Sequence, residues 1–293
     1  MLAVVLAGTG LRAAGVLNAD RTARLNALAY YIALPALIFT ATYDQSVGDL
    51  LSPALLAGLV IVFVVTAALA WLVHRDRWSQ PRRSVAVVQS YHSNLGYLGL
   101  PLVAATFDGE VTAIASVILG IGSLVQVPLT VLVLVGLNDA DTRVRDELRE
   151  VATNPVIASL VAGLAVGPIG IDVPSPVATG LNGLGALALP LALLCVGASL
   201  GLDLPSVDVG AMLSVVGLKI ALMPVLAWTV FTAFAVDPAT LTAGVVMFGT
   251  PTAVSTFVYS NELGGDEGFA SLNVFVTTVA SVGSLFVLIE LVG

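Results

Sequence analysis

Polar and helix-breaking residues interrupt an apolar stretch of this sequence, over residues 83–106, that is long enough to cross a bilayer. Near its middle, Asn94 is followed by Gly96, Gly99 and Pro101. Proline removes an amide donor and clashes with the carbonyl four residues earlier, and glycine weakens a helix by about 1 kcal/mol relative to alanine. In lipid, the freed backbone groups must be buried in protein or line a wet cavity. We therefore expect Pro101 to interrupt the helix, as is typical of a solute site; a proline kink filled by a neighbouring helix is the alternative.

A second stretch of the same kind occupies residues 249–256. It contains Pro251 and a cluster of hydroxyl side chains, namely Thr250, Thr252 and Ser255. These hydroxyls could bond to carbonyls of their own helix, or donate to a ligand beside the break. If the two broken helices cross, two half-helix N-termini point at one spot, which would attract an anion. Asn94 would add an amide able to donate or accept there.

Four further polar residues lie deep in apolar segments. Lys219 is expected near mid-membrane, where burying a charged side chain is energetically costly. It could balance the charge of a substrate or pair permanently with a carbonyl or carboxylate. His92 could couple protons or serve as a hydrogen-bonded packing residue. Gln126 and Asn273 could line a path or only bind helices together.

The composition is that of a membrane protein with several spans. Of 293 residues, 58% are hydrophobic and 10% are charged, and the mean hydropathy is +1.01. A soluble domain carries about 25% charged residues. We expect an all-α polytopic protein in the cell membrane. A net charge of −8 gives no basic footprint for nucleic acid.

Catalysis and cofactor binding are not expected. One cysteine and two histidines exclude an internal disulfide and make a zinc site implausible. Residues 197–201 read G-x-S-x-G, but a hydrolase needs a later histidine, and both histidines come earlier. No phosphate loop of the Walker type is present in the sequence, which argues against an ATP-driven pump.

Apolar stretches divide the chain into ten expected helical segments, separated by turn and breaker residues. They cover residues 1–16, 25–43, 53–73, 83–106, 111–136, 154–169, 176–200, 209–234, 239–261 and 269–292. The first is short for a span, so it is either a half-span or continues upstream of Met1.

Arginines gather in three alternate connections and are absent from those on the opposite face. These connections contain Arg12, Arg21, Arg24, Arg75, Arg77, Arg82, Arg83, Arg143, Arg145 and Arg149. The positive-inside rule places them in the cytoplasm, and ten spans then put both termini outside. We interpret residues 137–153 as a cytoplasmic linker, with a short solvated helix, between domains at 1–136 and 154–293.

The two halves show signs of a repeat. Ala-Leu-Pro ends at Pro35 and again at Pro190, and Pro101 is matched by Pro251 at nearly the same shift. An odd number of five spans per half requires the second half to be inverted. Inverted repeats with broken helices in matching positions are a transporter architecture.

With these residues in place, the chain resembles the auxin efflux carrier family of PIN-like carriers. The most specific match is Asn-x-Gly-x-x-Gly-x-Pro, from Asn94 to Pro101. The other matching stretches are Leu34–Phe39, Leu189–Leu200, Leu218–Pro224 and Gly249–Asp266. The resemblance implies ten spans in two inverted five-helix repeats, a scaffold and a transport domain, and an organic anion such as auxin or a dicarboxylate. It implies that broken helices four and nine cross at mid-membrane, and that Asn94 is the binding asparagine.

The expected site follows from these arguments together. The substrate-binding set is Asn94, Gly96, Pro101, Thr250, Pro251, Thr252, Ser255 and Lys219, and the path-lining set is His92, Gln126 and Asn273. Some family members carry an asparagine soon after the second proline, where this chain has Thr252 and Ser255, so the substrate stays open.

The leading hypothesis is a secondary transporter that moves a small carboxylate by alternating access. The first alternative is a sodium-coupled symporter of the bile-acid type; the absence of a carboxylate near the centre of the broken helices argues against it. The second alternative is a membrane sensor or subunit that does not transport. Direction of transport and coupling ion stay open, and so does the oligomeric state, for which a homodimer is one option.

Overall fold

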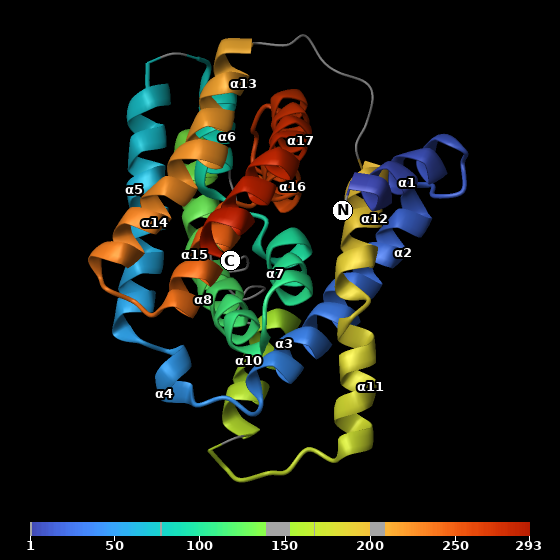
Figure 1. The fold of residues 1–293 in the computed structure, drawn as a ribbon. Coiled ribbons are helices and arrows are strands. Elements are labelled where there is room, and N and C mark those ends of the chain that lie inside the picture. Colours follow the sequence, from blue (N-terminus) through green and yellow to red (C-terminus); the bar gives the residue numbers. More distant parts are fainter. Residues whose placement is uncertain (1, 77, 139–152, 167, 200–208) are drawn as a thin grey trace. The chain divides into compact units, whose positions relative to one another are not determined.

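The computed structural model describes residues 2–76, 78–138, 153–166, 168–199 and 209–293. Within these residues every regular element is a helix, and the β pairing is confined to one isolated bridge. The helices group into two compact units, each drawn from three separate stretches of the chain (Figure 1). Unit 1 comprises Met1–Ser52, Gly96–Gly120 and Thr153–Leu202, and unit 2 comprises Pro53–Leu95, Ile121–Ala152 and Asp203–Gly293.

Unit 1 is held together by close helix contacts at small residues. Its helices are α1 (Leu2–Ala13), α2 (Ala19–Leu28), η1 (Ala29–Ala33), α3 (Leu34–Thr42), α4 (Val47–Leu50), α7 (Leu100–Thr106), α10 (Pro155–Val166), α11 (Ser175–Gly185) and α12 (Ala188–Ser199), with the start of α8. Helices α1 and α12 pack side by side, and a Cβ added to Gly197 would collide with the carbonyl of Val5. Thr9 Oγ1 donates to Gly197 O at 2.9 Å. Gly197, within the G-x-S-x-G run, therefore permits helix packing.

Unit 2 contains two helix interruptions, at residues 92–94 and 249–254. Its helices are α5 (Pro53–His74), α6 (Gln80–Tyr91), the later part of α8 (Gly109–Asn138), α13 (Val209–Val216), η3 (Gly217–Leu222), α14 (Met223–Ala233), α15 (Pro238–Phe248), α16 (Ser255–Glu262) and α17 (Glu267–Val292). Figure 1 shows α14 lying along α5. The fully buried ring of Phe231 fits against Gly58 of α5 and Gly244 of α15. The same ring stacks on Phe248, with 6.4 Å between centroids.

Three π-helical turns precede prolines at a constant distance. Turns η1, η2 (Leu95–Gly99) and η3 end two residues before Pro35, Pro101 and Pro224, and each proline enters the first turn of the next α-helix. Proline supplies no amide hydrogen and clashes with the carbonyl four residues back. A locally wider turn removes that clash, so each π turn continues directly into the α-helix that contains the proline.

Six helical segments of the described chain are long and apolar enough to cross a membrane. They are Ala19–Thr42, Pro53–His74, Gly109–Asn138, Ser175–Ala198, Val209–Ala233 and Glu267–Val292. Shorter apolar helices cover Ala3–Ala13, Leu95–Thr106, Pro155–Val166 and Pro238–Phe248. The expected all-α membrane fold is confirmed. Ten spans, the inverted repeat and the division into halves stay predictions, and residues 139–152 of the expected linker lie outside the described part.

Candidate functional site

Two interrupted helices of unit 2 meet at their breaks. Helix α6 ends at Tyr91, helix α15 ends at Phe248, and Ser93 pairs with Thr252 in an antiparallel bridge. The N–H of Asn94 donates to Pro251 O at 2.9 Å, and the N–H of Ala253 donates to His92 O at 3.0 Å. We call residues 92–94 and 249–254 the helix crossing. Each break therefore satisfies backbone groups of the other, which apolar surroundings require.

The position of the first break differs from the sequence expectation. Pro101 was expected to interrupt its helix, but it lies within the first turn of α7, a position that tolerates proline. The interruption falls at residues 92–94 instead. Pro251 does lie in an interruption, between α15 and α16. Gly96 and Pro101 belong to unit 1, where a Cβ on Gly96 would reach Leu119 at 3.5 Å, so their proposed role in binding stays a prediction.

Gln126 of α8 satisfies the main chain of Ser93 with both ends of its amide. The N–H of Ser93 donates to Gln126 Oε1 at 3.0 Å, and Gln126 Nε2 donates to Ser93 O at 3.2 Å. Of the two roles considered for Gln126, binding helices together is the one seen here. The contact could not be read from the sequence, because the two residues are 33 positions apart.

His92 and its neighbour Tyr91 share one hydroxyl partner on α8. His92 Nδ1 lies 2.7 Å from Thr130 Oγ1, and Tyr91 OH lies 3.1 Å from the same oxygen. All three side chains are buried. His92 is thus hydrogen-bonded within the packing, which is one of the two alternatives that the sequence left open.

The threonines of the second break are engaged with backbone groups. Thr250 Oγ1 donates to Met247 O at 2.7 Å, in its own helix, and Thr252 Oγ1 donates to His92 O at 3.3 Å, across the crossing. Both residues are fully buried, whereas Ser255, the first residue of α16, is partly exposed. Ser255 therefore offers a hydroxyl at a helix N-terminus, where an anion is favoured.

Lys219 brings a buried ammonium group to the crossing. It lies in the π turn η3 with 0% exposure, and its Nζ donates to Phe248 O at 2.9 Å and contacts Met223 Sδ at 3.3 Å. Ser93 Oγ approaches the same sulfur, at 3.5 Å. The ammonium is therefore separated from the Ser93 hydroxyl by one thioether. Among the described residues no carboxylate pairs with Lys219.

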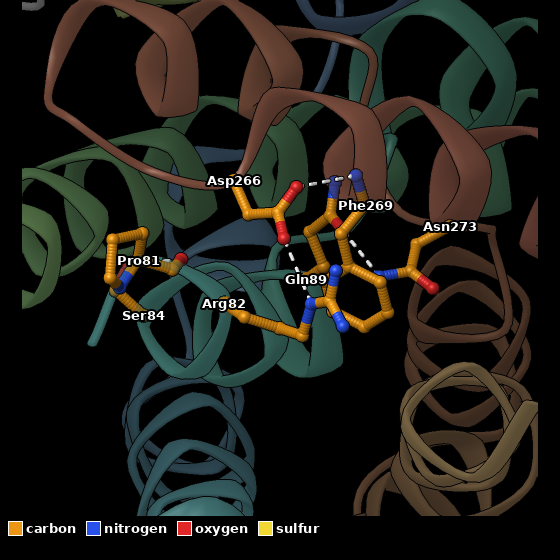
Figure 2. A network of polar contacts seen from close by, with 7 residues as sticks. All are labelled: Pro81, Arg82, Ser84, Gln89, Asp266, Phe269 and Asn273. Atoms are coloured by element: carbon orange, nitrogen blue, oxygen red, sulfur yellow. Dashed lines mark hydrogen bonds and ion pairs between the residues drawn. The ribbon is translucent and has the colours of Figure 1, made fainter. Parts of the chain in front are cut away.

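A buried amide pair joins α6 and α17 beside the crossing (Figure 2). Gln89 Nε2 donates to Thr256 Oγ1 and to Ala270 O, both at 3.0 Å, and Asn273 Nδ2 donates to Gln89 Oε1 at 2.9 Å. Asn273 thus binds helices together here. Gln89 was not among the residues expected to matter, although an amide inside the apolar stretch 83–106 is a signal that it has a polar partner.

An ion pair closes the end of the same helix pair. Arg82 Nε lies 2.8 Å from Asp266 Oδ2, and its guanidinium lies over the ring of Phe269, 5.4 Å from the centroid (Figure 2). Asp266 also caps α17, because its Oδ1 accepts from the N–H of Phe269 at 3.0 Å. The backbone N–H of Asp266 donates to Pro81 O at 3.2 Å. Both ends of α6 are thus fixed within unit 2.

No described group of three or more histidine, cysteine or acidic residues is arranged to hold a metal ion. The chemical resources of the crossing are therefore an ammonium group, amides, hydroxyls and a helix N-terminus. These groups can hold an anion by charge and hydrogen bonds.

These features define a multi-pass membrane protein with two interrupted helices joined at their breaks. The sequence model of the "Membrane transport protein" family matches residues 1–145 and 144–289, nearly the whole chain. The protein belongs to this family, which is the auxin efflux carrier family that its motifs resemble.

Two curated relatives cover most of the chain. A Rhizobium meliloti protein named "Putative malonate transporter" is 26% identical over 282 residues, 92% of this chain and 86% of that protein. A Methanothermobacter thermautotrophicus protein named "Uncharacterized transporter" is 24% identical over 289 residues, 97% of this chain and 94% of that protein. Both names describe transporters, as the family does.

Proposed function

We propose that this protein is a transporter, not an enzyme, that carries a small carboxylate across the membrane, and that the helix crossing binds it. The observation that carries the proposal is the buried amine of Lys219, whose described partners, Phe248 O and Met223 Sδ, are both neutral. A buried ion without a counter-charge is costly in a membrane protein. A carboxylate bound beside Lys219 would supply the missing charge. The name of the Rhizobium meliloti relative, which mentions malonate, supports this substrate class.

The proposed binding residues within unit 2 are Asn94, Thr250, Pro251, Thr252, Ser255 and Lys219. Of these, Lys219 supplies charge, Asn94 an amide, and Ser255 a hydroxyl at the start of α16. Thr250, Pro251 and Thr252 hold the backbone of the second break in place through the contacts described above. We propose alternating access with unit 2 as the moving transport domain, which is the mechanism that the family resemblance implies.

The test is a thermal-shift measurement with malonate on purified protein. Ligand stabilises by RT ln(1 + [L]/Kd), so even a weak binder registers at high concentration. Malonate should raise the Tm of the wild type and of Arg75→Gln, which removes a charge from an exposed side chain. It should raise the Tm of Lys219→Gln much less. An equal rise in Tm in all three proteins would mean that Lys219 has a structural role and does not bind malonate.

Flux measurements then separate transport from the two alternatives. Proteoliposomes loaded with labelled malonate should exchange it without sodium if the carrier hypothesis is right. Flux that requires sodium would favour the sodium-coupled symporter. Binding without flux under any ion gradient would favour a sensor or subunit.

A further inference from the structure

The main chain of Ser93 is held on both edges, like a residue in the middle strand of a sheet. On one edge, its neighbours bond to the second break: His92 O accepts from Ala253 N, and Asn94 N donates to Pro251 O. Successive peptide groups of an extended chain point to opposite sides. The N–H and C=O of Ser93 itself therefore face away from the second break, and the Gln126 amide meets both of them, at 3.0 and 3.2 Å.

Gln126 takes the place of a third strand in this short ladder. A carboxamide carries one acceptor and a donor, in the same plane, as a peptide group does. The side chain is 4% exposed, so water does not compete freely for these bonds. Ser93 O also accepts from the N–H of Leu95 at 2.9 Å. Leucine or methionine would therefore leave the Ser93 N–H unmatched and remove one of the two donors to Ser93 O, and glutamate would lose the donor that Gln126 supplies to Ser93 O. Among common side chains of this length, glutamine alone satisfies both groups.

The two peptide groups that flank Ser93 are consequently fixed at both ends. In the first, His92 O and Ser93 N are bonded to Ala253 N and Gln126 Oε1. In the second, Ser93 O and Asn94 N are bonded to Gln126 Nε2 and Pro251 O. The peptide that enters Asn94 thus cannot rotate without breaking a buried hydrogen bond.

We propose that Gln126 is a positioning residue that orients Asn94 for substrate, without touching substrate itself. The inference rests on the proposed function, because Asn94 is the amide assigned there to the anion. A site held within a fraction of an ångström loses much of its affinity when its support is removed. Gln126 acts through Asn94, so its contribution to binding depends on the Asn94 side chain.

A double-mutant cycle tests this dependence through the Kd for malonate. Gln126→Met should weaken malonate binding on the order of 10- to 100-fold, as expected for a displaced binding group. In the Asn94→Ala background the same change should have little further effect, because coupled residues are not additive. Gln80→Glu, which changes an exposed glutamine of the same unit, should bind as the wild type does. Additive effects of Gln126→Met and Asn94→Ala would overturn the proposal.

Hydrogen exchange supplies a readout that needs no ligand. The amides of Ser93 and Asn94 should exchange slowly in the wild type and in Gln80→Glu, and faster in Gln126→Met. Unchanged exchange would overturn the proposal even if affinity fell. If the wild type binds no malonate, the proposed function fails, whereas faster exchange in Gln126→Met still establishes the clamp on Ser93. Gln126→Glu, of nearly equal volume, serves for both measurements if the methionine variant does not fold.

Discussion

At the scale of single residues, most polar side chains at the crossing form hydrogen bonds with its backbone. Thr250 and Thr252 bond to carbonyls, and Gln126 bonds to Ser93. This arrangement differs from a wet cavity in which water satisfies the broken helices. A ligand bound here as proposed would meet a backbone that is already satisfied, and it would gain affinity from the few groups with spare hydrogen-bonding capacity. Lys219 and the partly exposed Ser255 are such groups.

Replacement of Asn94 tests the residue that the family resemblance assigns to binding. Asn94→Ala should weaken malonate binding by ~1–3 kcal/mol, the range for leaving a buried polar partner unmatched. Titration calorimetry on the detergent-solubilised protein measures the change. Asn261→Ala, an exposed asparagine of α16, is the matched control and should bind normally. If Asn94→Ala bound malonate with wild-type affinity, the fold would stand but the binding site would have to lie elsewhere.

At the scale of helices, close packing around one aromatic ring positions the second break. Phe231 of α14 contacts both Gly244 of α15 and Phe248. The carbonyl of Phe248 accepts the hydrogen bond from Lys219. Phe248 also packs edge-on against Phe63 of α5, with 5.0 Å between ring centroids. The end of α15 is thus fixed by rings on two neighbouring helices, because interiors of this density resist small shifts.

Glycine is required at position 244 by this packing. Gly244→Ala would drive a Cβ into the Phe231 ring, so it should lower the free energy of unfolding by ~1–3 kcal/mol through overpacking. Gly283→Ala on α17 meets no atom within 4 Å, and should be neutral or stabilising by up to about 1 kcal/mol through helix propensity. Thermal unfolding of both variants measures the difference. A Gly244→Ala protein as stable as Gly283→Ala would contradict the packing argument.

The sequence predicted where helices lie far better than how their side chains pair. Apolar runs and breakers placed most helical segments near their observed positions, because those signals are local, but the short helix α4 lies in a stretch expected to be a connection. The first break was assigned to Pro101, since proline is the strongest breaker, yet a π turn accommodates that residue and the chain opens at 92–94. Gln89 and Asn273 are 184 positions apart, so nothing local indicates that they bond. Such long-range pairs decide how the site is built.

At the scale of the whole molecule, neither predicted half makes a compact unit of its own. Unit 1 takes Met1–Ser52 and Gly96–Gly120 from the first half and Thr153–Leu202 from the second, and unit 2 takes the rest from both. The chain leaves unit 2 directly after the crossing, at Leu95, and returns within α8 at Ile121. Each half therefore depends on the other for its packing, and truncation at the linker should not yield a folded half.

The charges of the chain predict its orientation in the membrane, and this prediction can be measured. The arginines of three alternate connections, among them Arg143, Arg145 and Arg149, predict that residues 137–153 face the cytoplasm. A single cysteine at Asp141, in a Cys195→Ala background, should react with a membrane-impermeant maleimide after permeabilisation and not in intact cells. A cysteine at Asp172, in an acidic connection predicted to lie outside, is the matched control and should react in intact cells. Because arginine is retained on the cytoplasmic side whereas acidic residues contribute little, the reverse labelling pattern would overturn the orientation.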